Sequence, residues 1–107
     1  MIARIWHGKT SLENFEAYKA FLKEFAAPKF KKAKGFKGLT FLRNINGEEG
    51  HFTVITYWEN LEVIKNFAGK EFEKPVYYPQ DNDFLLEFEE KVQHYEVFAN
   101  DINANMV

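Results

Sequence analysis

The amino-acid sequence predicts an α+β protein in which an antiparallel four-stranded sheet carries two helices. Three observations predict this class. Two segments have apolar residues at helical spacing, four are rich in β-branched and aromatic residues, and an Asn-Gly pair separates the two middle strands. The chain has 107 residues, 46% of them hydrophobic, which suits one folded domain and is too short for two. We expect one domain over residues 1–98 and a polar C-terminal tail over 99–107.

The first half of the domain begins with one strand and one helix. Residues 2–7 form a short apolar run that is typical of a strand. Residues 12–26 repeat apolar side chains every three or four positions, which indicates a helix, and Pro28 should end this helix or bend it sharply. Residues 29–38, rich in lysine, are expected to connect the helix to the next strand.

A hairpin follows this connection. Asn46-Gly47 is a strong hairpin signal, because both residues tolerate a positive φ. The flanking residues 39–45 and 51–58 favour strands. The two strands should therefore pair as direct neighbours in the sheet.

The rest of the domain supplies a second helix, a loop and a last strand. Asn60 can cap a helix whose end is marked by Gly69. Residues 70–90 are expected to form a loop with one or two helical turns, and residues 92–98 the last strand. The order strand, helix, strand, strand, helix, strand is that of a ferredoxin-like βαββαβ fold, with both helices on one face of the sheet.

The predicted strands carry apolar residues on both faces. In the third strand, Phe52 and Val54 share one face, whereas Ile55 and Tyr57 share the other. Two helices cover only one face, and each large apolar side chain left in water costs about 1.5–3 kcal/mol. We therefore expect a homodimer in which the two sheets pack face to face and form a shared barrel.

The composition excludes several classes of function. The chain has no Cys, which excludes disulfides, thiolate metal sites and cysteine nucleophiles. The net charge of −2 argues against nucleic acid as a partner, and no apolar run approaches the ~18 residues of a membrane span. We expect a cytoplasmic protein whose high aromatic content, 18%, forms a dense core or lines a pocket.

Four segments of the sequence resemble the antibiotic biosynthesis monooxygenase superfamily, and in particular its small uncharacterised bacterial members. They are RIWHGKT, YWENLEVIKNFAG, KPVYYPQDNDFLLEFE and HYEVF, and the resemblance extends over about residues 1–98. It implies a dimeric α+β barrel with one pocket in each subunit, between the sheet and the helices. Some members oxygenate polycyclic aromatic substrates without metal or flavin, and others degrade haem.

The residues that serve haem degradation in this superfamily are not matched here. The haem-degrading members use an Asn on the first strand, a Trp in the second helix and a His beyond it that ligates iron. The first ten residues of this chain contain no Asn, Phe67 stands at the Trp position, and Tyr77 stands near the His position. Haem degradation is therefore less favoured, and we expect no metal or other bound cofactor.

The histidines are candidate general bases. His7, His51 and His94 all lie on predicted strands. His7 and His94 approach each other if the first and last strands pair, and either would suit proton abstraction from a phenolic substrate at neutral pH. The alternative is a hydrogen-bonded histidine at the sheet surface. The spacing of His and carboxylates does not favour a metal site.

Arg4 is unusual within an apolar strand. If its side chain faces inward it must be paired, and Glu96 on the last strand is the expected partner. That reading makes Arg4 part of a structural ion pair. The functional alternative is that its guanidinium holds an anionic or quinone oxygen of a substrate.

Aromatic side chains are the remaining candidates for a substrate pocket. The set comprises Trp6, Tyr57, Trp58, Phe67, Tyr77 and Tyr78, which would line a site for a flat aromatic ligand. The alternative is that they belong to the core. Tyr77 and Tyr78 lie in a proline-flanked loop, where a role in the core explains a tyrosine less readily than it does on a strand or helix. Tyr77 is also a candidate catalytic residue.

These observations favour a small monooxygenase acting on a hydrophobic or aromatic compound. The protein would remove a proton with His7, His94 or Tyr77 and exclude water, so that O₂ reacts directly with the substrate anion. The alternative is a non-catalytic, ligand-binding or stress-related dimer of the same fold.

Overall fold

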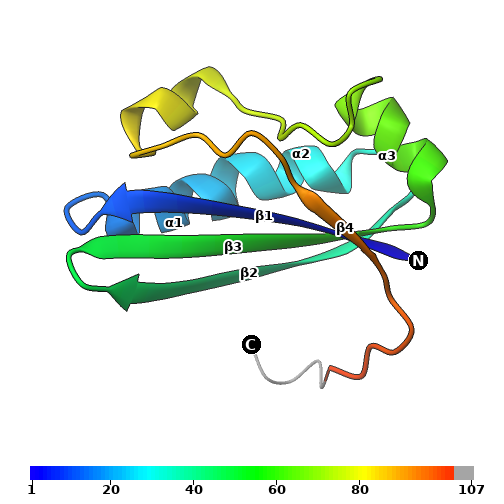
Figure 1. Ribbon diagram of the computed structural model, residues 1–107, viewed down its shortest axis with the longest axis horizontal. Helices are drawn as coiled ribbons and strands as arrows, with labels where there is room; N and C mark the ends of the chain where they lie inside the picture. The colour runs from blue at the N-terminus through cyan, green and yellow to red at the C-terminus, as the bar shows by residue number, and fades with distance from the viewer. Residues whose placement is uncertain (103–107) are drawn as a thin grey trace.

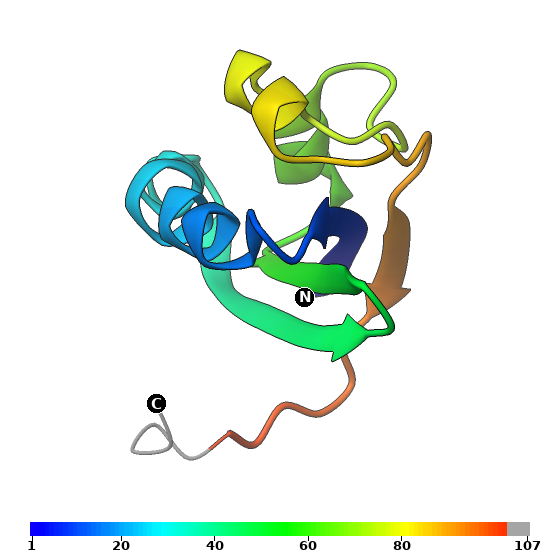
Figure 2. The same ribbon diagram turned by 90° about the vertical axis from the view of Figure 1, so that its left-hand side faces the viewer.

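Helices and a long irregular segment cover one face of an antiparallel four-stranded sheet (Figures 1 and 2). The computed structural model describes residues 1–102. In chain order the elements are β1 (Ile2–Ser11), α1 (Phe15–Phe21), the π-helical segment η1 (Leu22–Ala26), α2 (Ala27–Lys31), β2 (Phe36–Asn46), β3 (Glu49–Trp58), α3 (Leu61–Ala68), the 3₁₀ helix η2 (Pro79–Asp83) and β4 (Gln93–Glu96). The strand order β2-β3-β1-β4 is that of a ferredoxin-like fold, so the predicted fold class is confirmed.

The first helix continues through Pro28, so the prediction that it ends or bends sharply there is wrong. The π-helical segment η1 directly precedes Pro28, which lies in the first turn of α2. Within a helix, proline lacks one backbone donor and its ring clashes with the carbonyl group four residues earlier. The π turn closed by the Ala27 N–H on the Leu22 carbonyl oxygen supplies the local irregularity that accommodates Pro28 here. The connection expected over 29–38 is correspondingly shorter, since 29–31 are helical and 36–38 belong to β2.

The β2–β3 hairpin forms where the Asn-Gly pair predicts it, with the turn one residue further on. Its central residues are Gly47 and Glu48, and Gly47 has a φ of 64°, a value that side chains with a Cβ rarely adopt. The pairing places Leu42 opposite Thr53 and Phe41 opposite Val54. Both strands are longer than expected because pairing extends to the turn.

The second half of the chain follows the prediction closely up to the last strand. The Asn60 side chain accepts a hydrogen bond from the Val63 N–H at the start of α3, and Gly69, with a φ of 90°, follows the end of that helix. Residues 70–90 form the expected loop around a 3₁₀ helix. The strand expected over 92–98 is shorter, because only Gln93–Glu96 pairs with β1 as β4.

The core lies between the sheet and the helices, in two adjoining clusters. One contains Tyr18 and Phe52, and the other contains Trp58 and Ile64. These side chains are nearly or fully inaccessible to solvent. Alternation along β3 sends every second residue into this core.

The opposite face of the sheet carries no helix (Figure 2). The pairing register places Ile5 opposite Ile55 and Ala3 opposite Tyr57 on this face. Leu42 and Tyr95, which share the face, are about half exposed. The apolar residues expected on both sides of the sheet are therefore present.

The end of the described chain is irregular. Residues 99–102 have no regular secondary structure, and the rest of the expected tail, 103–107, lies outside the described residues. Within residues 1–102, no helix has the length and apolar character that crossing a lipid bilayer requires.

Candidate functional site

A small cavity lies between the helix-covered face of the sheet and the chain that follows α3. Its volume is about 60 Å³. Strands β1 and β3 form one wall and the helices a second, while residues from 75 to 92, which we call the lid segment, close it. The lining is largely apolar and aromatic and comprises Arg4, Trp6, Tyr18, Phe21, Leu22, Ala26, Phe30, Val54, Thr56, Phe67, Pro75, Val76, Tyr77, Tyr78, Asp81 and Val92.

The volume of this cavity limits what it holds in the closed form. Sites for drug-sized ligands usually measure about 300–1,000 Å³, so the closed cavity has room for a few water molecules and not for a fused-ring compound. The lid segment is the wall with the least regular structure. Irregular segments open at lower free-energy cost than packed helices or strands, so displacement of the lid segment is the route by which a larger ligand would enter.

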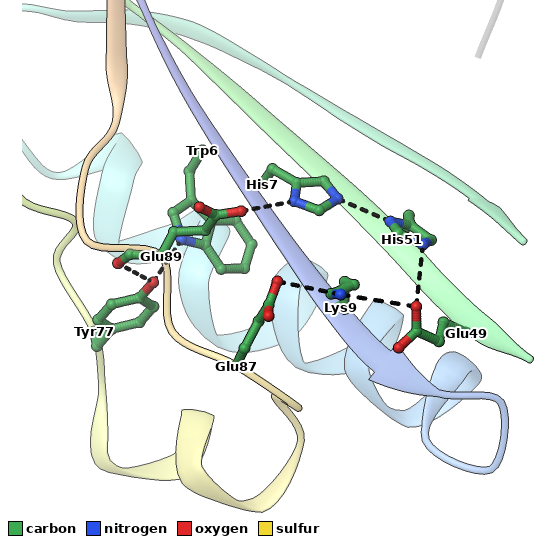
Figure 3. Close-up of polar contacts among 8 residues, drawn as sticks. All are labelled: Trp6, His7, Lys9, Glu49, His51, Tyr77, Glu87 and Glu89. Atoms are coloured by element: carbon green, nitrogen blue, oxygen red, sulfur yellow. Dashed lines mark hydrogen bonds and ion pairs between the residues drawn. The ribbon is translucent and has the colours of Figure 1, made fainter. Parts of the chain in front are cut away.

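Trp6 and Tyr77 connect the sheet to the lid segment inside the cavity (Figure 3). The Trp6 Nε1–H donates to the Tyr77 hydroxyl at 3.1 Å, and that hydroxyl donates to the Glu89 carbonyl oxygen at 2.9 Å. Burial raises the pKa of Tyr77. At neutral pH its phenol therefore stays protonated and serves as a hydrogen-bond donor, not as a base.

Asp81 places a buried carboxylate at the cavity. The Tyr18 hydroxyl donates to Asp81 Oδ1 at 3.1 Å, and the Tyr78 backbone N–H donates to Oδ2 at 2.7 Å. Burial raises the pKa of Asp81, although both hydrogen bonds lower it. Burial and the nearby Asp81 charge also raise the pKa of Tyr18. Asp81 is thus a stronger base than an exposed aspartate.

Sequence reasoning missed Tyr18 and Asp81 as site residues. Tyr18 belongs to the apolar stripe of the first helix and has the pattern of a core residue. Asp81 lies in a polar turn with Asp83, and only the fold distinguishes the buried carboxylate from the exposed one. The one sequence signal for Asp81 is its position in the turn that directly follows Tyr77 and Tyr78, which are candidate site residues in a proline-flanked loop.

Arg4 holds the loop that contains Phe72 and Lys74, directly before the lid segment, against the sheet, and it also lines the cavity. Its guanidinium donates to the carbonyl oxygens of Phe72 and Lys74, the latter at 2.9 Å, and to His94 Nε2 at 3.0 Å. Burial lowers the pKa of Arg4 to about 10, so it remains a cation at neutral pH. Since a guanidinium has no acceptor, His94 Nε2 must accept, and burial and Arg4 both lower the pKa of His94.

Two of the expected pairings are wrong. Glu96 does not pair with Arg4, because Glu96 lies opposite Ile2 and the residue opposite Arg4 is His94. His7 and His94 do not approach each other, because His94 shares the helix-covered face with Arg4 whereas His7 lies on the other face.

The other predicted site residues divide between the cavity, the core and the face of the sheet that carries no helix, which we call the open face. Phe67 and Tyr78 line the cavity, as do Arg4, Trp6 and Tyr77. Trp58 is fully buried in the core and donates from Nε1 to Thr56 Oγ1 at 2.8 Å. Tyr57 and His7 lie on the face of the sheet that carries no helix, so neither contacts the cavity.

Comparisons with solved structures identify the architecture. A candidate antibiotic biosynthesis monooxygenase from Nitrosomonas europaea superposes with a TM-score of 0.65 at 14% identity, over 92% of this chain and 100% of that chain. The chain has the antibiotic biosynthesis monooxygenase fold. A second protein of N. europaea, of unknown function, has a TM-score of 0.69 at 14% identity, over 96% of this chain and 94% of that chain. The resemblance inferred from the sequence is therefore confirmed at the level of the fold.

The haem degrader MhuD from Mycobacterium tuberculosis, with two haems bound, is also similar. Its TM-score is 0.57 at 21% identity, over 94% of this chain and 99% of that chain. No protein-family model matches the chain, and no curated protein is significantly similar to it in sequence.

Haem does not fit the residues of this cavity. Among the described residues that line it there is no histidine, the proximal ligand in many haem proteins, and the Tyr77 hydroxyl is already engaged by the Trp6 Nε1–H and the Glu89 carbonyl oxygen. Residues 1–102 also contain no group of three or more His, Cys, Asp or Glu side chains arranged to hold a metal ion. The side chains that line this cavity therefore do not match a haem or metal site.

Proposed function

We propose that this protein is a cofactor-independent monooxygenase that acts on a small phenolic or fused-ring aromatic compound. The observation that carries the proposal is that two buried side chains of opposite charge, the Asp81 carboxylate and the Arg4 guanidinium, line one aromatic cavity without pairing with each other. The fold shared with a candidate monooxygenase supports it.

Asp81 is the proposed general base. Its pKa is raised by burial, which increases its affinity for a proton. A bound phenolic substrate gives its proton to the carboxylate, and Tyr18 and Tyr78 hold that carboxylate in place through the hydrogen bonds described above. Asp81 thus takes the role of general base that the sequence analysis predicted for His7, His94 or Tyr77.

Arg4 is proposed to stabilise the substrate anion. In the described residues no carboxylate lies within ion-pair distance of its guanidinium, and its contacts are with two carbonyl oxygens and His94. A buried cation without a counter-charge favours an anionic oxygen nearby. With an anthrone as substrate, O₂ converts the ring CH₂ into a carbonyl, the second oxygen atom leaves as water, and the substrate supplies all four electrons.

Oxygen uptake with dithranol at pH 7 tests the proposal. We expect protein-dependent uptake of one O₂ per dithranol, above the rate without protein, with the quinone as product. Asp81→Asn should lower that rate at least tenfold, because the amide cannot accept the proton. Asp83→Asn, in the same turn and exposed, is the matched control and should keep the wild-type rate. Equal rates with and without protein for a panel of anthrones would refute the proposal.

We further propose that the chain forms a homodimer through the face of the sheet that carries no helix. Ile5, Ile55, Tyr57, Leu42 and Tyr95 provide the apolar surface, and burial of such side chains is favourable. Sedimentation at micromolar concentration should give the mass of two chains. Tyr57→Glu should shift the equilibrium to the monomer.

A non-catalytic, ligand-binding protein is the second candidate. The observation that favours it is that, among the described residues lining the cavity, there is no histidine, so the histidines predicted from the sequence as general bases, His7 and His94, are absent from it. Saturable binding of an aromatic compound without oxygen uptake would support this function over the first.

A further inference from the structure

A row of polar side chains on the open face of the sheet takes no part in the cavity (Figure 3). His7 Nδ1 lies 3.0 Å from Glu89 Oε1, and His7 Nε2 lies 2.9 Å from His51 Nδ1. His51 Nε2 in turn lies 3.8 Å from Glu49 Oε1. Two imidazoles are thus joined to each other and flanked by a carboxylate at each end.

Glu89 links this row to the cavity, because its side chain contacts the row and its backbone contacts a cavity residue. Its carboxylate contacts His7, whereas its carbonyl oxygen accepts the hydrogen bond of the Tyr77 hydroxyl. Tyr77 in turn accepts from Trp6 Nε1. Trp6 and His7 are neighbours in β1 and point to opposite faces, so the contacts pass around the edge of the sheet from one face to the other.

Only one hydrogen atom fits between the two histidines. A carboxylate only accepts, so His7 Nδ1 carries a hydrogen toward Glu89. The pair accommodates one extra proton. In that state His7 Nδ1–H donates to Glu89, His51 Nδ1–H donates to His7 Nε2, and His51 Nε2–H faces Glu49. A second extra proton places an N–H against an N–H across the 2.9 Å gap, and the rings must then separate. His7 is the more exposed ring, 39% against 21% for His51, so His7 is the ring that turns away, and its contact with Glu89 is lost.

The other charged groups around the pair belong to the same three segments. Lys9 Nζ on β1 lies 3.3 Å from Glu87 Oε1 of the lid segment and 3.8 Å from Glu49 Oε1 on β3. The neighbours of the histidines are therefore Lys9, Glu49, Glu87 and Glu89. Each ion pair is partly exposed, so each holds the lid segment only weakly.

We propose that the contact of Glu89 with the His7–His51 pair is a latch that positions Tyr77 and closes the lid segment, and that a second extra proton on the pair opens it. His7 then acts as a positioning residue through Glu89 and touches no substrate. The catalytic meaning of the latch rests on the proposed function, whereas the latch itself is measurable without any substrate.

Amide hydrogen exchange of residues 84–92, corrected for the intrinsic rate, tests the latch at pH 7.5 and 5.0. In the wild type we expect exchange about three- to fivefold faster at pH 5.0, a change typical of losing one partly exposed ion pair. Glu89→Gln should exchange at this faster rate already at pH 7.5. Glu90→Gln removes the same charge from the exposed neighbouring residue and should behave as the wild type.

His51→Asn distinguishes the histidine pair from a simple ion pair. Without the second ring, acid protonates His7 alone and strengthens its contact with Glu89, so exchange in the lid segment should become slower at pH 5.0. The Trp6 indole N–H resonance should shift in Glu89→Gln because Tyr77 moves. The Trp58 indole N–H, bonded to Thr56 in the core, is the internal control and should not shift.

Three results would overturn the latch. One is equal exchange in Glu89→Gln and Glu90→Gln at pH 7.5. Another is acid-accelerated exchange that persists in His51→Asn. Sedimentation at both pH values shows whether assembly changes as well, and a change of assembly with unchanged lid exchange also contradicts the latch. If oxygen uptake is absent but the exchange results hold, the proposed function fails and the latch stands.

Discussion

The two tryptophans lie on the same face of the sheet but in different surroundings. Trp58 is fully buried, and its indole N–H bonds to Thr56, two residues away on its own strand. Trp6 is only partly buried, and its indole N–H bonds to Tyr77, 71 residues away in the lid segment. The first is satisfied by its own strand, whereas the second depends on a segment with little regular secondary structure. In this molecule the indole N–H of the core tryptophan finds its acceptor on its own strand, whereas that of the cavity tryptophan finds its acceptor in a distant segment.

The comparison predicts that removing Trp58 affects stability most. Trp58→Ala should lower the free energy of unfolding by about 3–5 kcal/mol, because it leaves a large cavity in the core. Urea denaturation followed by circular dichroism measures this. Trp6→Ala is the matched variant, and an equal loss there would mean that the two surroundings do not differ.

Tyr18→Phe should have the next largest effect. It removes the side-chain donor to the buried Asp81 carboxylate and should cost about 1–3 kcal/mol, since the acceptor stays buried. Because the Tyr18 bond also lowers the pKa of Asp81, the pKa of Asp81 should rise further in the variant. Denaturation and NMR titration of the carboxyl carbon measure the two effects. Loss of stability without a change in pKa would contradict the assigned contact.

Asp81 should make stability depend on pH in a defined direction. Its folded pKa is raised, so the folded state binds more protons than the unfolded state between the two pKa values. Stability therefore falls as the pH rises from the ordinary aspartate range through the folded pKa. The stability of the wild type relative to Asp81→Asn, measured at pH 3.5 and 7, should be lower at pH 7. The opposite sign would mean that the hydrogen bonds outweigh burial.

His94 should give a smaller pH effect near neutrality. Its folded pKa is lowered by burial and by Arg4, so the neutral ring stabilises the fold above the unfolded pKa, and this contribution is lost as the pH falls through the folded value. Between pH 7 and 5, His94→Gln should lose less stability than the wild type. The effect is small because the ring is partly exposed to solvent.

The sequence predicted the fold well because its signals are local. Helical spacing, the Asn60 cap and the Asn46-Gly47 pair act within a few residues, and each appears in the structure within a residue or two. Pro28 misled the prediction because the π-helical segment before it has no clear sequence signal.

The candidate site was less predictable because it depends on which strand faces meet. Alternation along β1 puts Arg4 and Trp6 on one face of the sheet. The partner of Arg4 could not be predicted, because it depends on the register of β4 and on the loop that holds Phe72 and Lys74. Asp81 was missed because its burial arises only when the lid segment folds onto Tyr18.

The π-helical segment sets the angular phase of the first helix. On an ideal α-helix, Tyr18 and Phe30 would lie about 120° apart around the axis, yet both line the cavity. The wider turn over Leu22–Ala26 rotates less per residue and brings the two rings toward one side. Deleting a single residue there would leave the two positions 11 apart on a regular helix, about 20° around the axis, so the wide turn absorbs one extra residue while both rings keep to one side.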